Sequence, residues 1–490
     1  MTNLTEVEGV AVPTDHYIGG RRVSSETTFE VRSPIDWDNW KLAEVANGGQ
    51  AEVDAAVAAA RRAFPEWASL GPDKRHDHLT RLADAIDQAV PDLAKVETAD
   101  NGSLYEAMSL RVLPRAANNI RFFADFARDR LTQETRTLHG GERNRVRYDP
   151  AGVAAVSTPW NAPFMLATWR VGPALAAGDT VVLKPPEWAP LTCSLLGDLA
   201  DQAGLPPGVL NIVHGTGAGA GAPLTGHRNV DRVAFTGSPA TAHMVYRDAA
   251  ANLTPVSFEL GGKSPFIVFE DADLDAAAAT AAYQYDNSGQ VCLAGTRLLV
   301  QSTILDEFLE RFEANTRKIK VGDPRDPDTT YGPLIHPVAL ERVTGHVDRA
   351  IAEGARLAFG GTPIKGLYYP PTLFTDVPPQ AEILEHEVFG PVLTLQTFDD
   401  EPQAITMANA TDYGLAATIY TGSEDRADRI SAAVVAGTVW VNCFYVRDLE
   451  TPFGGARDSG IGREGGHHSF DFYADVKTVC ERTALFSAPE

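Results

Sequence analysis

A regular alternation of short apolar segments and helical patterns constrains the fold of this chain more than any other feature. The alternation runs through the middle of the sequence, after Asp149. Strands that alternate with helices of ~10–15 residues predict a parallel sheet whose strands are joined by crossover helices. We therefore expect an α/β fold here. The predicted strands are Val153–Ser157, Thr180–Leu183, Val209–Val213, Arg232–Phe235 and Pro255–Phe258.

Polar residues stand directly after these strands. Parallel sheets of this kind bind ligands beyond the carboxyl ends of their strands. The polar residues therefore predict one ligand site at one edge of the sheet. They are Asn161, Lys184, Glu187, Gly237, Ser238 and Glu259.

The stretch around Ser238 indicates how an anion could be held. Phe235–Ser238 ends a strand and opens a helix, so Ser238 can cap the helix while its free N–H groups face a group such as pyrophosphate. Gly460, Gly462 and Gly465 match the G-x-G-x-x-G pattern literally. A polar loop and no predicted strand precede them, so this match is rejected as a dinucleotide fingerprint.

The remaining segments predict further α/β structure and an arm. Helices are expected at 50–64, 72–90, 91–100, 114–130, 306–319 and 336–353, and strands at 298–301, 392–396, 418–420 and 438–442. Residues 137–149 alternate like a hairpin arm, with His139 and Gly140 at its turn, and 470–479 alternate like a last strand that pairs with another subunit.

Size and charge limit the partners of the chain. Its 490 residues predict two or three domains. With 42 Lys and Arg against 65 Asp and Glu, the formal net charge is −23, which disfavours nucleic acid and anionic membranes as partners.

The amino terminus has no pattern of a secretory signal, and the four cysteines are scattered without the spacing of a metal site. We expect a cytoplasmic protein without a membrane span and without a metal; the histidines at 76, 78, 467 and 468 lack neighbouring ligands.

Glu259 and Cys292 are the residues best suited to chemistry. Glu259 ends an apolar run before Gly261 and Gly262, and Cys292 lies among small residues between Gly289 and Gly295. An acid leaving a strand and a thiol on a glycine-flanked turn suit a base and a nucleophile. The alternatives are a buried structural cysteine and an ordinary turn acid.

The chain resembles the aldehyde dehydrogenase superfamily over nearly its whole length. The matching motifs are Pro159–Asn161, Lys184–Glu187, Phe235–Ser238, Glu259–Lys263, Gly289–Cys292, Glu387–Pro391 and Pro452–Gly455. The resemblance implies an α/β aldehyde dehydrogenase-like fold. It has a Rossmann-like NAD-binding domain (1–132 and 150–260), a catalytic domain (261–460) and a small β arm for oligomerisation (133–149 and 461–490).

The resemblance also implies roles. Cys292 would attack an aldehyde, Glu259 would act as base, and the Asn161 amide and the Cys292 N–H would stabilise the oxyanion. NAD would be the cofactor. A carboxylate at Glu187 that accepts ribose hydroxyls would repel the extra phosphate of NADP. The implied cofactor-binding residues are Trp160, Lys184, Glu187, Gly237, Ser238, Leu260, Glu387 and Phe389.

One branch of the superfamily is more similar than the others: the dehydrogenases of muconic semialdehydes in the degradation of aromatic compounds. The similarity lies in Pro114–Ala116, Val446–Leu449 and Gly462–Gly466. It implies a carboxylated semialdehyde substrate, with Arg447 and Arg115 binding its carboxylate. The polar residues 285–287 stand where the superfamily commonly has an apolar wall.

Other functions remain open at this stage. The dehydrogenase could act on an aromatic, aliphatic or betaine-type aldehyde. A cysteine hydrolase would use the same thiol and acid without Lys184, Glu187 or the Gly237–Ser238 turn. A silent relative would tend to have lost Cys292 or Glu259. We expect a small-molecule aldehyde as partner and a homodimer or homotetramer.

Overall fold

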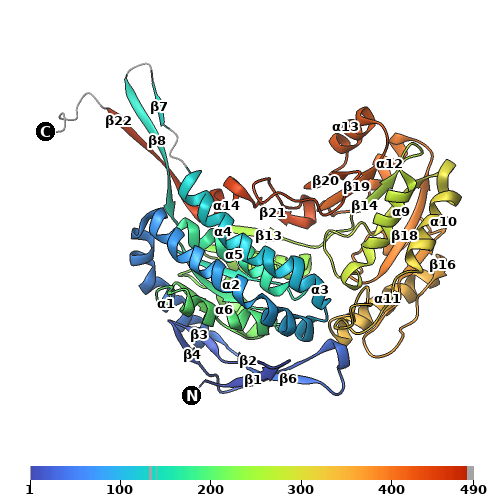
Figure 1. Ribbon diagram of the computed structural model, residues 1–490. Helices are drawn as coiled ribbons and strands as arrows, with labels where there is room; N and C mark the ends of the chain where they lie inside the picture. The colour runs from blue at the N-terminus through green and yellow to red at the C-terminus, as the bar shows by residue number, and fades with distance from the viewer. Residues whose placement is uncertain (1, 132–134, 139–140, 483–490) are drawn as a thin grey trace.

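Two open sheets form the body of the protein. The structure is a computed structural model that describes residues 2–131, 135–138 and 141–482. The first sheet has eight strands in the order β21-β13-β12-β9-β10-β11-β3-β4, and the second has seven in the order β16-β17-β18-β15-β14-β19-β20. They lie in opposite halves of the molecule (Figure 1). The predicted α/β class is confirmed.

Parallel strands make the centre of the first sheet, as the alternation predicted. They are β9 (Val153–Ser157), β10 (Thr180–Lys184), β11 (Leu210–Ile212), β12 (Arg232–Thr236) and β13 (Val256–Glu259). The antiparallel edge strands are β3 (His16–Ile18), β4 (Arg21–Val23) and β21 (Gly460–Ile461).

Both faces of this sheet are covered, which explains why its strands are apolar throughout. Along β9, Ala154 and Val156 pack into one core, while Val153 and Ala155 pack into the other. The covering helices are α1 (Gln50–Ser69), α2 (Gly71–Asn101), α4 (Leu113–Asp129), α5 (Pro163–Ala177), α6 (Leu191–Gln202), α7 (Ala222–Thr225) and α8 (Pro239–Ala250).

Helix α2 corrects the sequence-based prediction. Two helices were expected at 72–90 and 91–100, but one helix of 31 residues runs from Gly71 to Asn101 with Pro91 inside it. An interior proline costs about 3 kcal/mol of helix stability. Helix α2 packs along α4, α5 and α6. Tertiary packing of its apolar face offsets the cost of the proline.

The second sheet is parallel except at one edge. Its strands are β14 (Pro265–Val268), β15 (Arg297–Gln301), β16 (Arg356–Phe359, antiparallel), β17 (Thr372–Thr375), β18 (Val392–Phe398), β19 (Ala416–Tyr420) and β20 (Thr438–Val441). Its helices are α9 (Leu274–Ala282), α10 (Leu305–Thr316), α11 (Pro337–Ala352), α12 (Glu401–Ala408) and α13 (Glu424–Ala433).

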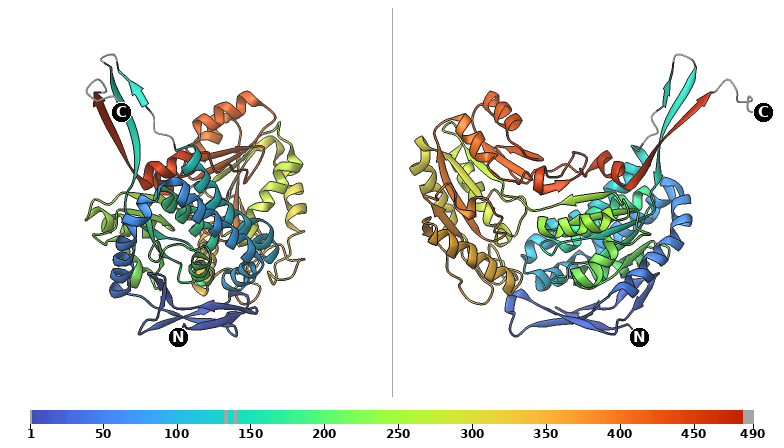
Figure 2. Two further views of the ribbon diagram at one scale, coloured as in Figure 1. Left: turned by 60° about the vertical axis from the view of Figure 1, so that its left-hand side comes forward. Right: turned by 180° about the vertical axis from the view of Figure 1, so that it is seen from behind.

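An arm extends away from both sheets (Figures 1 and 2). It is a three-stranded antiparallel sheet of β7 (Thr135–Thr137), β8 (Glu142–Pro150) and β22 (Ala474–Arg482). The predicted turn residues His139 and Gly140 lie outside the described residues. Residues 470–473 were predicted as strand but belong to helix α14 (Gly466–Tyr473), whose Phe470 and Tyr473 are buried against the first half of the chain.

The first strands of the chain run beneath the first half and reach the second at one end (Figure 2). They form two small antiparallel pairs, β1 (Leu4–Val7) with β2 (Val10–Pro13) and β5 (Thr28–Arg32) with β6 (Lys41–Ala46). No helix among the described residues is long and apolar enough to cross a membrane.

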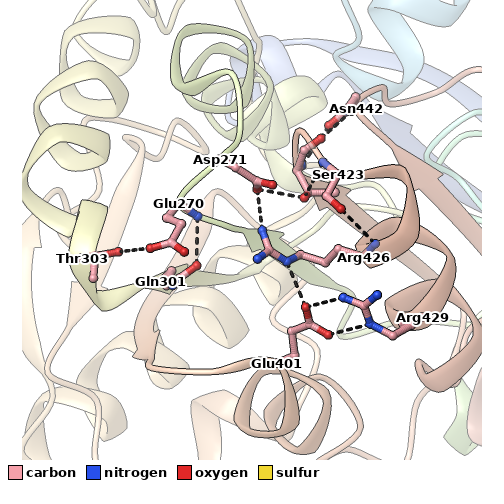
Figure 3. Close-up of polar contacts among 10 residues, drawn as sticks. Glu270, Asp271, Gln301, Thr303, Glu401, Ser423, Arg426, Arg429 and Asn442 are labelled. Atoms are coloured by element: carbon pink, nitrogen blue, oxygen red, sulfur yellow. Dashed lines mark hydrogen bonds and ion pairs between the residues drawn. The ribbon is translucent and has the colours of Figure 1, made fainter.

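The two sheets meet at opposite strand ends. Strand β13 ends at Glu259, and β14 begins at Pro265 without a crossover helix between them. The carboxyl edge of the first sheet therefore faces the amino edge of the second. The carboxyl edge of the second sheet lies on its far side, where side chains following its strands bond to one another (Figure 3).

Arg426 is the centre of that far network. It pairs with Asp271 (2.7 Å) and Glu401 (3.0 Å), and its guanidinium lies 4.8 Å from the centre of the Phe269 ring. Thr421 donates to Asp271 at 2.9 Å, and Arg429 donates to the same Glu401 carboxylate at 2.8 Å. These contacts neutralise the edge at which such a sheet otherwise binds ligands.

We expect Arg426→Met to lower the free energy of unfolding by about 1–3 kcal/mol, because it leaves two acids without their half-buried cation. Arg429→Met is the matched control. Its side chain is 57% exposed against 20% for Arg426, so its loss is expected to cost ~0–1 kcal/mol. Urea unfolding followed by tryptophan fluorescence measures both; equal losses would contradict a central role for Arg426.

Candidate active site

A cavity of about 830 Å³ opens where the two sheets meet. Residues from both sheet edges and from α4 line it. Among them are most of the residues predicted from the sequence: Arg115, Trp160, Asn161, Gly237, Ser238, Glu259, Leu260, Cys292, Glu387, Phe389 and Arg447. Lys184 and Glu187 are not part of its lining.

Cys292 lies on a loop that is pinned by its neighbour Gln290. The buried Gln290 side chain accepts from the Ile335 N–H (2.9 Å) and donates to the Asn287 carbonyl (3.1 Å). A Cβ atom on Gly262 would lie 2.8 Å from the Cys292 carbonyl oxygen. The glycine predicted beside the acid is thus required for the close approach of the cysteine loop.

Burial determines the protonation state of the Cys292 thiol. It raises the pKa of Cys292 to about 12; the carboxylates of Glu387 and Glu259 add to this rise, and Arg447 opposes it. The thiol is therefore protonated at neutral pH. Because the thiolate is the nucleophilic form of cysteine, a reaction of this thiol would require a base beside it.

Glu259 has the properties of such a base. It is the last residue of β13, it is only 7% exposed, and neither carboxylate oxygen has a hydrogen-bond partner in the described part of the chain. Burial raises its pKa to about 7, while the charges of Arg170, Arg447 and Arg463 limit the rise. A general base is most effective when its pKa is close to the working pH.

Asn161 is held against the cysteine loop. Its side-chain amide donates to the Gln290 carbonyl at 3.0 Å, and the Asn287 amide donates to the Asn161 carbonyl at 3.4 Å. The neighbouring Trp160 meets the Phe389 ring edge to face, with centroids 5.3 Å apart. Two side chains predicted as catalytic and cofactor-binding thus flank the same wall of the cavity.

Glu387 approaches the backbone between the two sheets. Its carboxylate accepts from the Gly262 N–H at 3.0 Å, and burial raises its pKa to about 7. A Cβ atom on Gly261 would lie 2.1 Å from one of its oxygens. Gly261 is therefore needed for space, since only a residue without a side chain leaves room for this carboxylate.

Lys184 and Glu187 lie together further along the same sheet edge. Lys184 pairs in register with Ser157 of β9, the strand that leads to Trp160 and Asn161. The Lys184 ammonium donates to the Pro185 carbonyl (2.8 Å), and burial lowers its pKa to about 8. Glu187 is half-buried and accepts from the Gly217 N–H at 2.9 Å. They flank a glycine-rich turn outside the cavity.

Helix α8 begins at the cavity as the sequence predicted. The Ser238 hydroxyl caps it by accepting from the Thr241 N–H at 3.3 Å. Gly237, Ser238 and Pro239 all line the cavity. The first N–H groups of a helix have no partners within the helix, so this end suits an anion.

Arg447 and Arg115 bring positive charge to the cavity. The Arg447 guanidinium lies 3.5 Å from the centre of the Phe453 ring and 4.6 Å from that of Trp169. Its Nε and Nη2 atoms, and Nε of Arg115, are buried without a hydrogen-bond partner among the described residues. Burial lowers the pKa of Arg447 to about 9, and the charge of Arg115 contributes to that shift.

Several contacts of this site were not predicted from the sequence. Trp169 and Phe453, which hold Arg447, come from a helix and a loop far apart in the chain. Arg170 is 1% exposed; it forms an ion pair with Glu464 and donates to the Ser257 hydroxyl at 3.0 Å. Such contacts across a fold leave no local spacing pattern.

The comparisons with known proteins agree with this architecture. The model of the aldehyde dehydrogenase family matches residues 22–479. The 2-hydroxymuconic semialdehyde dehydrogenase of Pseudomonas sp. (strain CF600) is 42% identical over 480 residues, covering 95% of this chain and 98% of that protein. The 5-carboxymethyl-2-hydroxymuconate semialdehyde dehydrogenase of Escherichia coli is 41% identical over 466 residues, covering 93% and 98%.

A solved structure shows the same fold. The P. syringae indole-3-acetaldehyde dehydrogenase, in complex with NAD+ and IAA, superposes with a TM-score of 0.94 at 38% identity and covers 97% of each chain. The chain belongs to the aldehyde dehydrogenase family. It is an oxidoreductase that acts on aldehydes, which favours this function over the cysteine hydrolase considered from the sequence.

We expect Glu259→Gln to stabilise the protein more at pH 8 than at pH 5. The pKa of Glu259 is about 7 in the folded protein, above its ordinary value of ~4.3. Between these two values the unfolded chain releases the proton and the folded protein keeps it, so stability falls as pH rises. At ~1.4 kcal/mol per pKa unit, the gain at pH 8 exceeds that at pH 5 by about 2–3 kcal/mol.

Thermal and urea unfolding of both proteins at several pH values measure this difference. Glu310→Gln, which changes an exposed acid, is the control. A gain from Glu259→Gln that does not depend on pH would contradict a buried, unpaired carboxylate.

Proposed function

We propose that this protein oxidises a carboxylated muconic semialdehyde to the acid with NAD, through a covalent intermediate on Cys292. One observation carries the proposal. The cavity that holds the thiol and an unpaired acid also contains two guanidinium groups, from Arg447 and Arg115, with buried N–H donors that nothing in the described chain accepts. A carboxylate is the group that such a pair binds best.

The first step assigned to the chain is proton removal from the thiol. Glu259 takes the Cys292 proton, directly or through a water molecule, and the thiolate attacks the aldehyde carbon. The arginine charges near Glu259 keep its pKa from rising further, so a useful fraction is ionised at neutral pH. The product of this step is a thiohemiacetal on Cys292.

The oxyanion of the thiohemiacetal needs hydrogen-bond donors. The Asn161 amide, which bonds to the Gln290 carbonyl at 3.0 Å, is one, and the Cys292 N–H is the other. Removal of one such donor typically costs ~10²–10³-fold in rate. The contact with Gln290 keeps the Asn161 amide at the cysteine loop before the substrate arrives.

Residues in the cavity and beside it suit NAD. The α8 N-terminus would hold its pyrophosphate, Lys184 and Glu187 its adenosine ribose, and Glu387 its nicotinamide ribose, with Trp160, Leu260 and Phe389 as further contacts. Bound NAD would supply the acceptor for the hydride lost from the substrate. A Glu187 carboxylate that accepts hydrogen bonds from ribose hydroxyls would repel the extra phosphate of NADP.

The last step is hydrolysis of the Cys292 thioester. Glu259 removes a proton from water, which attacks the acyl carbon, and the thiol is released with the acid. The same carboxylate therefore acts twice, and its pKa of about 7 suits both steps.

The substrate class is inferred from the arginines and supported by the relatives, two of which are named for 2-hydroxymuconic and 5-carboxymethyl-2-hydroxymuconate semialdehydes. A protein with a net charge of −23 needs local cations to hold an anionic substrate. Aromatic, aliphatic and betaine-type aldehydes would leave both guanidinium groups unpaired.

The predicted organisation completes the proposal. Residues 1–132 and 150–260 are assigned to NAD binding, 261–460 to catalysis, and 133–149 with 461–490 to the arm. Strand β22 is an edge strand of the arm sheet, with backbone groups available for pairing. We infer a homodimer or homotetramer in the cytoplasm.

The covalent mechanism is tested with NAD, a panel of aldehydes and the absorbance of the reduced cofactor. We expect Cys292→Ala to abolish oxidation while NAD binding is retained. Glu259→Gln is expected to lose most of its activity, because both the Cys292 thiol and the attacking water lose their base. Mass spectrometry after one turnover shows whether Cys292 carries an acyl group; turnover close to that of the wild type would contradict both roles of Glu259.

The substrate class is tested by Arg447→Met. We expect its KM to rise strongly for carboxylated semialdehydes and to change little for a neutral aldehyde such as benzaldehyde. Loss of a charge-assisted pair in a closed pocket is worth ~2–4 kcal/mol. Arg317→Met, at a side chain that is 73% exposed, is the control. An equal rise for charged and neutral aldehydes would mean that Arg447 only supports its loop.

A further inference from the structure

Three polar side chains on the cavity wall have no role in the proposed reaction. They are Arg111, Tyr283 and Asp286. Arg111 belongs to the π-helical turn η2 (Met108–Val112), which continues directly into α4. It precedes Arg115 by four residues, so both arginines lie on the cavity side of one continuous helix. Single π-helical turns occur frequently at functional sites.

The three side chains interact in series. Arg111 Nη1 donates to the Tyr283 hydroxyl at 3.1 Å, and that hydroxyl also interacts with the Asp286 carboxylate. Tyr283 has only one proton to give, and an ionised carboxylate accepts up to about four hydrogen bonds. Asp286 therefore keeps acceptor positions that the wall itself does not use.

The loop around Asp286 holds an unfavourable backbone conformation. Asn287 and Ser288 follow it with φ values of 51° and 58°, a left-handed region that non-glycine residues rarely adopt. Ser103 donates to the Asn287 side chain at 3.1 Å, and Ser288 donates to the Gly332 carbonyl at 2.6 Å. Strain that its surroundings hold in this way is typical of functional sites.

In this loop the side chains of Tyr285 and Asp286 go to different places. Tyr285 is fully buried in the core of the second half and donates to the Thr372 carbonyl at 3.0 Å. Asp286 instead lines the cavity. Because the two side chains go to opposite sides of the loop, the Asp286 carboxylate lies on a cavity wall that is commonly apolar in the superfamily.

Tyr445 links this wall to the arginine pair and the thiol. Its ring lies 6.0 Å from the Tyr283 ring, edge to face. Tyr445 lines the same cavity as Asp286, Cys292, Arg115 and Arg447. A substrate held between Cys292 and the arginines therefore lies in the cavity that Asp286 lines.

We propose that Asp286, oriented by Tyr283 and Arg111, is a specificity-determining residue that accepts a hydrogen bond from a hydroxyl or amino substituent of the carboxylated aldehyde. The inference rests on the proposed function and deepens it. Arg111 balances the charge of Asp286, so this wall selects a neutral donor and gives no net attraction to a second carboxylate. An aldehyde without the donor leaves the half-buried Asp286 carboxylate unpaired, which lowers the affinity of the site for that aldehyde.

Adipate semialdehyde and its 2-hydroxy and 2-methoxy derivatives test the inference in steady-state assays with NAD. The hydroxyl donates a hydrogen bond, and the methoxyl occupies similar space but cannot donate. The wild-type enzyme is expected to prefer the hydroxy compound. In Asp286→Leu, kcat/KM for that compound should fall ~10–100-fold through a higher KM, with the other two compounds changed by less than about threefold.

Tyr283→Phe gives a second measurement in which the acid is kept and only its orientation is lost. Tyr283→Phe should also lower the preference for the hydroxy compound, but by a smaller factor than Asp286→Leu does. A thermal midpoint near that of the wild type establishes that the variant is folded. Asp428→Leu, at an exposed position on α13, is the control.

Two outcomes would overturn the inference: a hydroxy-to-methoxy ratio that is the same in Asp286→Leu and the wild type, or a better reaction of the wild type with a semialdehyde carrying a second carboxylate. Failure of the proposed substrate class gives a different result, since wild-type enzyme would then oxidise adipate semialdehyde no better than hexanal. The hydroxyl preference can still be compared in that case with 5-hydroxypentanal and pentanal.

Discussion

The junction between β13 and β14 is the constraint on which the rest of the structure depends. The chain leaves the first sheet at Glu259 and enters the second at Pro265. Only residues 260–264 connect the two, so the carboxyl edge of one sheet must face the amino edge of the other. Gly261 and Gly262 permit this approach, because a Cβ on either would collide with the Glu387 carboxylate or the Cys292 carbonyl.

Burial at this junction sets the chemistry of the cavity. It raises the pKa of Glu259 and of Glu387 to about 7, raises that of Cys292 to about 12 and lowers that of Arg447 to about 9. Each shift moves a group toward its neutral form, as expected when charge is removed from water.

At the far edge of the second sheet, the charged groups are paired with one another. Arg426 forms ion pairs there with Asp271 and Glu401. At the cavity, by contrast, Glu259, Arg447 and Arg115 have polar atoms without partners in the described structure. Unpaired buried groups are costly for stability, and an acid and two arginines of this kind in one cavity are typical of a site that a ligand completes.

The sequence by itself determined the α/β class, the parallel order of the first sheet and the residues that follow its strands. These depend on local patterns: apolar runs, helix caps and glycines. The helix broken at Pro91 and the strand over 470–473 were predicted wrongly, because packing against distant elements overrides local preference. Only the tertiary structure decided that Lys184 and Glu187 lie outside the cavity and that Trp169 and Phe453 hold Arg447. It also decided that the Asp286 side chain lines the cavity while that of Tyr285 packs in the core. Such arrangements join residues hundreds of positions apart, and their energies come from burial and contact, which no local spacing records.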